Sequence, residues 1–284
     1  MKKYFIICIS IFIIASCSSA PDNPGDVYFL RTQAEEGLET ANREASKGNF
    51  EFALSLLTGH KRSAILTDDL SLIVRVTLSK GNVLFSLGRF DEAFAEWDYA
   101  LKEAVLSANA ELISISKIFA ARGNLLSQRV SAQSVLDEIT RESANLKTRL
   151  YTAFSWQVRG LALRDLNRWR EAEEAVNQSL SIHDKDKQLE NASYDWYIIA
   201  SIRSLSGNLT GALQALETSI AIDRRIENSW GLASSWRAKG DVLRKDGREA
   251  EAIEAYIRAR TIYAQMASSR EAEEIDKKIN NGNL

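Results

Sequence analysis

A pattern of small residues that returns about every 40 positions limits the possible folds of this chain more than any other feature. Trp156, Trp196 and Trp236 are evenly spaced at an interval of 40, and a Gly or Ala follows each of them four positions later. Three further copies lie nearer the N-terminus. The six copies place their small residue at Ala41, Gly81, Gly123, Gly160, Ala200 and Gly240, with spacings of 40, 42, 37, 40 and 40.

The copies continue alike after the small residue. Seven positions later stands a residue that tolerates the left-handed end of a helix. These residues are Gly48, Gly88, Asn167, Gly207 and Gly247, with Val130 in a degenerate copy. Five positions further on are Ala53, Ala93, Ala172, Ala212 and Ala252, with Val135 in the degenerate copy. If the copies are helical, the small residues would lie where two backbones approach closely, with the Trp filling the wider gap beside them.

Proline usage agrees with a helical chain. The only two prolines are Pro21 and Pro24, so nothing from Gly25 onward interrupts a helix through a missing N–H or a ring clash. Alternation typical of strands is hard to find. The sequence therefore predicts an all-α protein.

The repeat resembles the tetratricopeptide repeat (TPR), in which antiparallel helix pairs stack into a right-handed superhelix. The usual unit has about 34 residues and often ends in Pro, whereas this chain has a longer period and no Pro in the repeats. A 40-residue variant with Gly-Asn or Gly-Asp at the small position occurs in kinesin light chains and spindle-orientation adaptors. Gly81-Asn82, Gly123-Asn124 and Gly240-Asp241 fit this variant. The resemblance implies an all-α, right-handed superhelix of about six TPR-like helix pairs plus a C-terminal capping helix.

The boundaries follow from the copies. Residues 26–267 form the predicted repeat domain, and residues 268–284 form a capping helix, about Ser269 to Asn280, and a tail. The six predicted pairs are 26–47 with 50–59, 66–87 with 90–108, 110–128 with 131–144, 147–166 with 169–184, 188–206 with 209–227, and 229–246 with 248–267.

The first residues have the features of an export signal. Lys2 and Lys3 precede an apolar run from Tyr4 to Ala15, which is too short to span a bilayer. Ile14-Ala15-Ser16-Cys17 resembles the lipobox of bacterial lipoproteins. The resemblance implies that residues 1–16 are a signal peptide, that Cys17 is acylated and anchored in a lipid bilayer, and that residues 17–25 are a flexible tether. The alternatives are an uncleaved anchor or a chance Cys.

The same resemblance bears on location. In many Gram-negative bacteria a residue such as Ser18 after the acylated Cys favours the outer membrane, here facing the periplasm, although this rule varies between bacterial groups. Cys8 lies in the segment to be removed, so the mature chain would hold no free thiol and no disulfide.

The residues that could perform chemistry form no recognisable site. The formal net charge is −2, which gives no support to nucleic-acid binding. The two histidines, His60 and His183, lie in apparent helix-end loops without a second ligand nearby, so solvated side chains are expected. No cofactor, metal site or catalytic arrangement is predicted, and the chain is interpreted as a non-catalytic protein.

The concave inner wall is the remaining candidate site, because TPR ligands lie along the first helices. A row of amides there would hold the backbone of an extended peptide, and nearby cations would suit an acidic partner. Alternatively, these Asn residues only hydrogen-bond the next helix. The candidate groove residues are Asn42, Arg75, Asn82, Lys117, Asn124, Gln128, Arg164, Ser201, Arg237, Asp241 and Arg244.

The tryptophans admit two interpretations. A stacking platform for a ligand is one, but a structural role is expected for the repeated Trp and for Trp97 and Trp169. Trp230 fits the repeat least well and is expected to be partly exposed. Two functions remain open: a membrane-anchored scaffold that binds a protein or peptide in envelope assembly or transport, or a periplasmic small-ligand-binding component associated with a transporter. The oligomeric state is open.

Overall fold

The computed structural model describes residues 29–281, and these residues form helices and short turns without a strand. The lipobox, Cys17 and the predicted tether lie outside the described residues. The α-helices are α2 (Phe29–Ser46), α3 (Phe50–Leu66), α4 (Leu70–Ser86), α5 (Phe90–Leu106), α6 (Ala110–Leu126), α7 (Ala132–Glu142), α8 (Arg149–Asp165), α9 (Trp169–Lys185), α10 (Leu189–Leu205), α11 (Leu209–Arg225), α12 (Ser229–Lys245), α13 (Glu249–Gln265) and α14 (Ser269–Asn281).

The helix lengths explain the period of the sequence pattern. Most helices share the length of α4 and α5, which have 17 residues each, and three-residue turns connect them. In each of these turns the second residue has a positive φ, for example 76° at Gly88 and 57° at Asn167. Gly and Asn were expected at this place because they adopt left-handed backbone conformations at low cost. The expected fold, six antiparallel pairs followed by a C-terminal helix, is confirmed.

Two predicted boundaries were wrong at the first repeat. The second helix was expected to stop at residue 59, but α3 continues through Gly59 and His60 to Leu66. Accordingly, the next helix begins at Leu70 rather than at residue 66. Burial of Leu57 and Ala64 on the inward face of α3 explains why one Gly does not end the helix.

The third repeat also differs from the prediction. In the other five pairs the small residue is the sixth from the end of the first helix, and in α6 this place belongs to Ala121 rather than Gly123. The left-handed turn residue is therefore Gln128, with φ of 56°, and not Val130. The α6–α7 turn has two extra residues, and α7 is short and ends in a 3₁₀ turn, Ser143–Asn145. With Ala121 taken as the small residue of the third repeat, the spacings between the small residues of successive repeats become nearly uniform.

The small residues accommodate large side chains from the second helix. A Cβ added at Gly81 would collide with the indole of Trp97, which is only 1% exposed, and one added at Gly240 would lie 2.6 Å from the Tyr256 ring. At Gly160 it would meet Val176 and lie 3.2 Å from a backbone oxygen, that of Ala172. The expected backbone-to-backbone approach thus occurs at Gly160, whereas aromatic rings occupy the space at the other two glycines.

The repeated tryptophans are less buried than expected. Trp156, Trp196 and Trp236 pack against the core but remain half-buried, as does Trp169, whereas Trp97 is fully enclosed. Cations lie over the exposed rings: the Lys239 Nζ is 4.8 Å from the Trp236 ring centre. The repeated Trp therefore covers the edge of the hydrophobic core instead of lying inside it.

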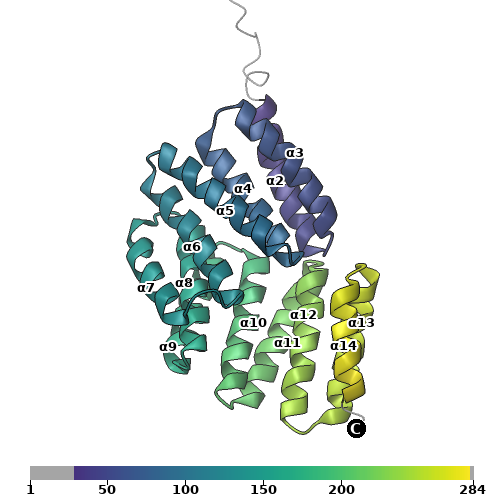
Figure 1. Cartoon of the computed structure of the whole chain (residues 1–284). Coiled ribbons are helices and arrows are strands. Elements are labelled where there is room, and N and C mark those ends of the chain that lie inside the picture. Colours follow the sequence, from purple (N-terminus) through teal and green to yellow (C-terminus); the bar gives the residue numbers. More distant parts are fainter. Residues whose placement is uncertain (1–28, 282–284) are drawn as a thin grey trace, which may run out of the picture.

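The superhelix returns on itself. Each first helix contacts the first helix of the next pair, and α12 in addition contacts α2. Figure 1 shows the pairs α2–α3 and α4–α5 above α12, α13 and α14. The Phe50 ring at the start of α3 meets Trp230 at the start of α12, edge to face, at 4.7 Å between centroids. Six repeats thus complete about one turn.

The contact of Gly81 with Trp97 gives a direct test. We expect Gly81→Ala to lower the free energy of unfolding by about 1–3 kcal/mol, because the added methyl forces the indole to move within a packed core. Gly59→Ala is the matched control: nothing lies within 4 Å of its Cβ position, so better helix propensity should raise stability by roughly 0.5–1 kcal/mol. Urea unfolding followed by circular dichroism measures both. Equal stability of Gly81→Ala and the parent would contradict the packing described.

Candidate functional site

The first helices of the pairs form the inner wall of the superhelix. This follows from their contacts with one another: α4 contacts both α2 and α6, and α10 contacts both α8 and α12. The position after the small residue was expected to face this wall, and it holds Asn42, Asn82, Ser201 and Asp241 as predicted. In α6 that position belongs to Arg122, so Asn124 lies two residues beyond it.

Three of these four polar side chains accept hydrogen bonds from side chains on neighbouring helices. Asn42 accepts a hydrogen bond from Ser79 of α4. Ser201 accepts one from the Arg164 guanidinium at 3.3 Å. The Asp241 carboxylate accepts from the Tyr256 hydroxyl at 2.7 Å and from the Lys278 Nζ at 2.6 Å. These contacts agree with the alternative interpretation, in which the polar row joins helices.

Asn82 differs from the rest of the row. Its Oδ1 is buried and has no hydrogen-bond partner among the described residues. An amide oxygen in that state costs free energy unless another donor reaches it. Asn82 is therefore the member of this row whose amide oxygen is unsatisfied, and that oxygen is covered rather than open to the groove.

Most predicted cations of the wall already form ion pairs. Arg244 lies 2.5 Å from Glu249, and it also donates to the backbone oxygen of Lys278 at 2.9 Å. Arg164 pairs with Asp165 at 2.8 Å. Arg75 has the longest of these contacts, 3.8 Å to Glu35, and its side chain is 40% exposed. Arg237 forms no ion pair with a carboxylate of the described residues and faces tyrosines instead.

The third repeat holds two further predicted residues, Lys117 and Gln128. Lys117 donates to Glu142 at 2.7 Å. Burial raises the pKa of Glu142, but hydrogen bonds from Lys117 and Ser114 outweigh it and lower the pKa overall. Gln128 lies in the α6–α7 turn with a left-handed backbone, outside the helix to which the prediction assigned it.

Arg237 lies in an aromatic part of the wall that the sequence analysis did not identify. Its half-buried guanidinium faces the hydroxyls of Tyr197 and Tyr263. Tyr197 also stacks on Tyr194, with 6.0 Å between ring centroids. Tyr197 has the same place in its repeat as Arg237 has in the next, so the repeat itself could have placed it on the wall.

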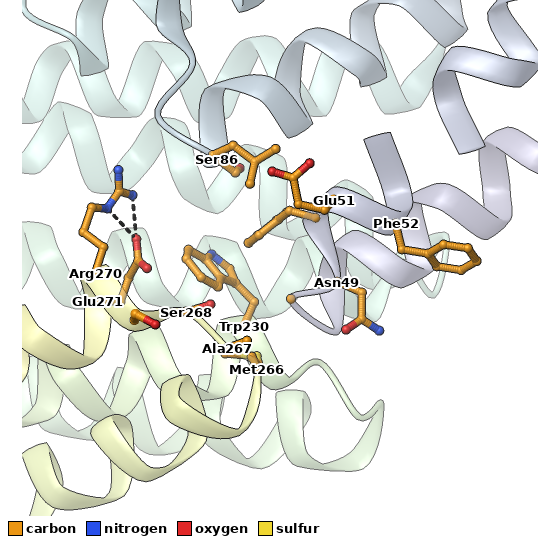
Figure 2. Close-up of a pocket in the computed structure, with 14 residues that line it drawn as sticks. Asn49, Glu51, Phe52, Ser86, Trp230, Met266, Ala267, Ser268, Arg270 and Glu271 are labelled. Atoms are coloured by element: carbon orange, nitrogen blue, oxygen red, sulfur yellow. Dashed lines mark hydrogen bonds and ion pairs between the residues drawn. The ribbon is translucent and has the colours of Figure 1, made fainter. Parts of the chain in front are cut away.

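An open cleft of about 610 Å³ lies where the superhelix closes. Figure 2 shows Trp230 in it, with Asn49 and Glu51 on one side and Arg270 and Glu271 on the other. Trp230 meets Phe50 and also Tyr263, at 5.3 Å between ring centroids. Trp230 is half-buried, in agreement with its expected partial exposure, but its role in closure was not predicted.

The predictions for the two histidines were wrong. His183 is on α9, only 2% exposed, and its Nδ1 lies 2.6 Å from the Asp195 carboxylate. His60 is within α3, and its ring packs over Gly37. His60 was assigned to a loop because the end of its helix was placed at residue 59. His183 was within the predicted helix 169–184, near its end, and the error was to expect a solvated side chain there. Within residues 29–281, no group of three or more His, Cys, Asp or Glu side chains is arranged to hold a metal ion.

Besides the contact of His183 with Asp195, a buried polar cluster joins α10, α11 and α12. The Ser219 hydroxyl is 2.9 Å from those of Ser193 and Ser235. Beside it, the Asn228 amide donates to Asp223 at 2.8 Å. Burial raises the pKa of Asp223 to about 6, although hydrogen bonds from its neighbours act in the opposite direction.

Comparisons with known proteins show the fold and nothing finer. No family model and no curated protein matches this chain. Similar solved structures include a Rap protein in complex with Competence and Sporulation Factor (TM-score 0.59, 12% identity, 88% of this chain and 76% of that one). BtubC from P. vanneervenii is another, with a TM-score of 0.53 and 15% identity over 84% of this chain and 92% of that one. The architecture is a TPR-like superhelix.

Asp223 predicts a dependence of stability on pH. Its folded pKa of about 6 lies above the ordinary 3.8, so folding binds a proton between these values, and stability falls as pH rises from about 4 to about 6. Asp223→Asn removes the titrating carboxyl, so the variant should not show this loss of stability between about pH 4 and about pH 6. We expect the variant to be more stable than the parent at pH 8 by at most about 3 kcal/mol, and equal near pH 4.

Thermal and urea unfolding from pH 4 to pH 8 check this expectation. Asp184→Asn, at an exposed position on α9, is the control and should show a small difference that does not vary over this range. A variant Asp223→Asn that is less stable than the parent at pH 8 would contradict the account, since it would mean that the cluster requires the charged carboxylate.

Proposed function

We propose that this chain is a membrane-anchored, non-catalytic scaffold that binds a protein or peptide partner along the inner wall of its superhelix. The observation that carries the proposal is the buried, unpartnered Oδ1 of Asn82 on that wall. Because that oxygen is covered and the residue is only half-buried, the amide must rotate toward the groove before a backbone N–H of an extended peptide can donate to it.

Charge gives the partner its expected character. Arg75 stands seven residues before Asn82, two turns along the same helix face, and its ion pair with Glu35 is long, at 3.8 Å. A carboxylate of an acidic peptide would pair with it. The solved Rap protein, which shares the fold, is in complex with a second molecule, the Competence and Sporulation Factor.

The anchor and the location complete the proposal. The helices of the described residues lack the length and apolar character that a membrane crossing requires. Attachment is assigned to acylated Cys17 on the strength of the lipobox, and Ser18 favours the outer membrane facing the periplasm. Envelope assembly or transport is the process that this combination suits.

The cleft at the closure favours a second candidate function. A volume of about 610 Å³ with aromatic and charged lining falls within the range of small-molecule sites. The chain would then bind a small ligand beside a transporter. A thermal-shift screen with metabolites tests this candidate, because a ligand that binds the folded state raises the midpoint, and Trp230→Ala should abolish the shift.

Charge reversal at one residue of the inner wall, compared with charge reversal on an outer helix, tests partner binding. We expect Arg75→Glu to weaken capture of the partner from envelope extract by at least about tenfold, since it places a negative charge opposite an acidic segment. Arg170→Glu is the matched control, because Arg170 lies on the outer helix α9 and also loses one exposed ion pair, to Glu174 at 3.2 Å. Quantitative mass spectrometry of the captured protein is the readout. If both variants lose partner capture equally, or if neither loses it, the result would contradict inner-wall binding.

Replacement of each cysteine tests the anchor. Cells supplied with a labelled fatty acid should incorporate the label into the parent and into Cys8→Ser, whereas Cys17→Ser should lose it completely. The thioether forms only at the Cys that follows the cleavage site. Label that persists in Cys17→Ser would show that the lipobox is not used.

A further inference from the structure

Exposed apolar residues gather along one edge of the first two repeats. Helix α3 ends in Ile65 and Leu66, and α5 ends in Val105 and Leu106, one repeat later. Leu66 is 65% exposed and Leu106 is 72% exposed. Single exposed apolar residues are ordinary on protein surfaces, but a contiguous group indicates a contact surface.

The starts of the first helices lie at the same edge, because the helices of each pair are antiparallel. Arg31 at the start of α2 pairs with Asp69, the N-cap of α4, at 3.1 Å. Glu111 at the start of α6 accepts from the backbone N–H of Lys147, just before α8, at 2.6 Å. These contacts bring further exposed side chains to the edge, namely Phe29, Leu30 and Leu150.

The repeat itself does not require apolar residues there. The last two residues of α9 are Asp184 and Lys185, and those of α11 are Arg224 and Arg225. The same helix position is therefore charged in α9 and α11 and apolar in the first two repeats. Packing does not explain the difference, since the apolar side chains at the ends of α3 and α5 are exposed.

The chain enters the structure at this same edge. Phe29 opens α2, and eleven residues separate it from Cys17. Even fully extended, this segment reaches at most about 40 Å, which keeps the edge close to any membrane that holds the acyl chains. Figure 1 shows the first two pairs at one end of the molecule and α12 to α14 at the other.

We propose that this edge rests on the lipid bilayer that holds acylated Cys17, with the apolar ends of α3 and α5 in contact with the headgroup region. The proposal rests on the lipid anchor proposed above. An anchor by itself leaves a domain free to rotate, whereas a second apolar contact fixes one orientation. The closure cleft and α12 to α14 are then held away from the membrane surface.

Single introduced cysteines test the orientation. The acylated mature chain has no other free thiol, so Leu106→Cys reports the edge alone. Leu205→Cys is the matched control: Leu205 is also the last, exposed residue of a helix, but it ends a first helix, at the opposite edge. The purified lipoprotein is placed in phosphatidylethanolamine–phosphatidylglycerol vesicles, and its reaction with a water-soluble maleimide is timed. The same variants of a chain that begins at Ser18, without acyl groups or vesicles, supply the reference rates.

The expected result is slowing of Leu106→Cys by at least about tenfold in vesicles, with Leu205→Cys changed less than about twofold, because burial protects a thiol. Unchanged rates at both positions, or equal slowing at both, overturn the proposal. Slowing of Leu106→Cys in the soluble chain as its concentration rises also overturns it, since a second copy then covers the edge. Intact mass and co-flotation report the anchor separately: a chain without lipid refutes the anchor, whereas a reactive Leu106→Cys in a lipid-bearing chain refutes the edge contact alone.

Discussion

The close packing of a small residue in the first helix of a pair against the second helix determines the geometry of the whole molecule. Gly81 receives Trp97, and Gly240 receives Tyr256. Because the helices and turns have nearly constant lengths, each pair adds a similar rotation to the stack. Six such pairs bring α12 back to α2, and there Phe50 meets Trp230. The inner wall, the closure cleft and the apolar edge are all consequences of that repetition.

The sequence predicted the helix pairs and most turns because small residues and left-handed turn residues are local signals. It failed in the third repeat, where Gly123 was taken as the small residue and the structure places Ala121 there. Both glycine and alanine occur at that position in the other repeats, so residue type did not decide between Gly123 and Ala121, and Gly123 itself contacts Trp97 from the preceding repeat. A constant spacing of 40 from Gly81 would have located Ala121. The burial of His183 was missed because it depends on Asp195 of the next repeat, which the local sequence around His183 does not show.

The site was less predictable than the fold. The wall positions followed from helix periodicity, but the availability of each side chain depends on which neighbours meet it across the stack. Arg244 is held by Glu249 and by the backbone of α14, a contact that joins residues 34 positions apart. Asn82, by contrast, lacks a partner among the described residues. The sequence shows a uniform row of polar residues. The structure divides this row into side chains that join helices and Asn82, whose amide oxygen has no partner in the described part of the chain.

The distance between the two ends of the superhelix tests the central claim most directly. Spin labels at Asn49→Cys and Ser268→Cys, in a chain that begins at Ser18 and so has no native Cys, face each other across the closure cleft. Double electron–electron resonance should give one short, narrow distance distribution. Gly160→Ala, midway along the stack, should broaden and lengthen it, because Val176 and the Ala172 backbone leave no space for a methyl. A long, broad distribution in the parent, or an unchanged one in Gly160→Ala, would contradict the account.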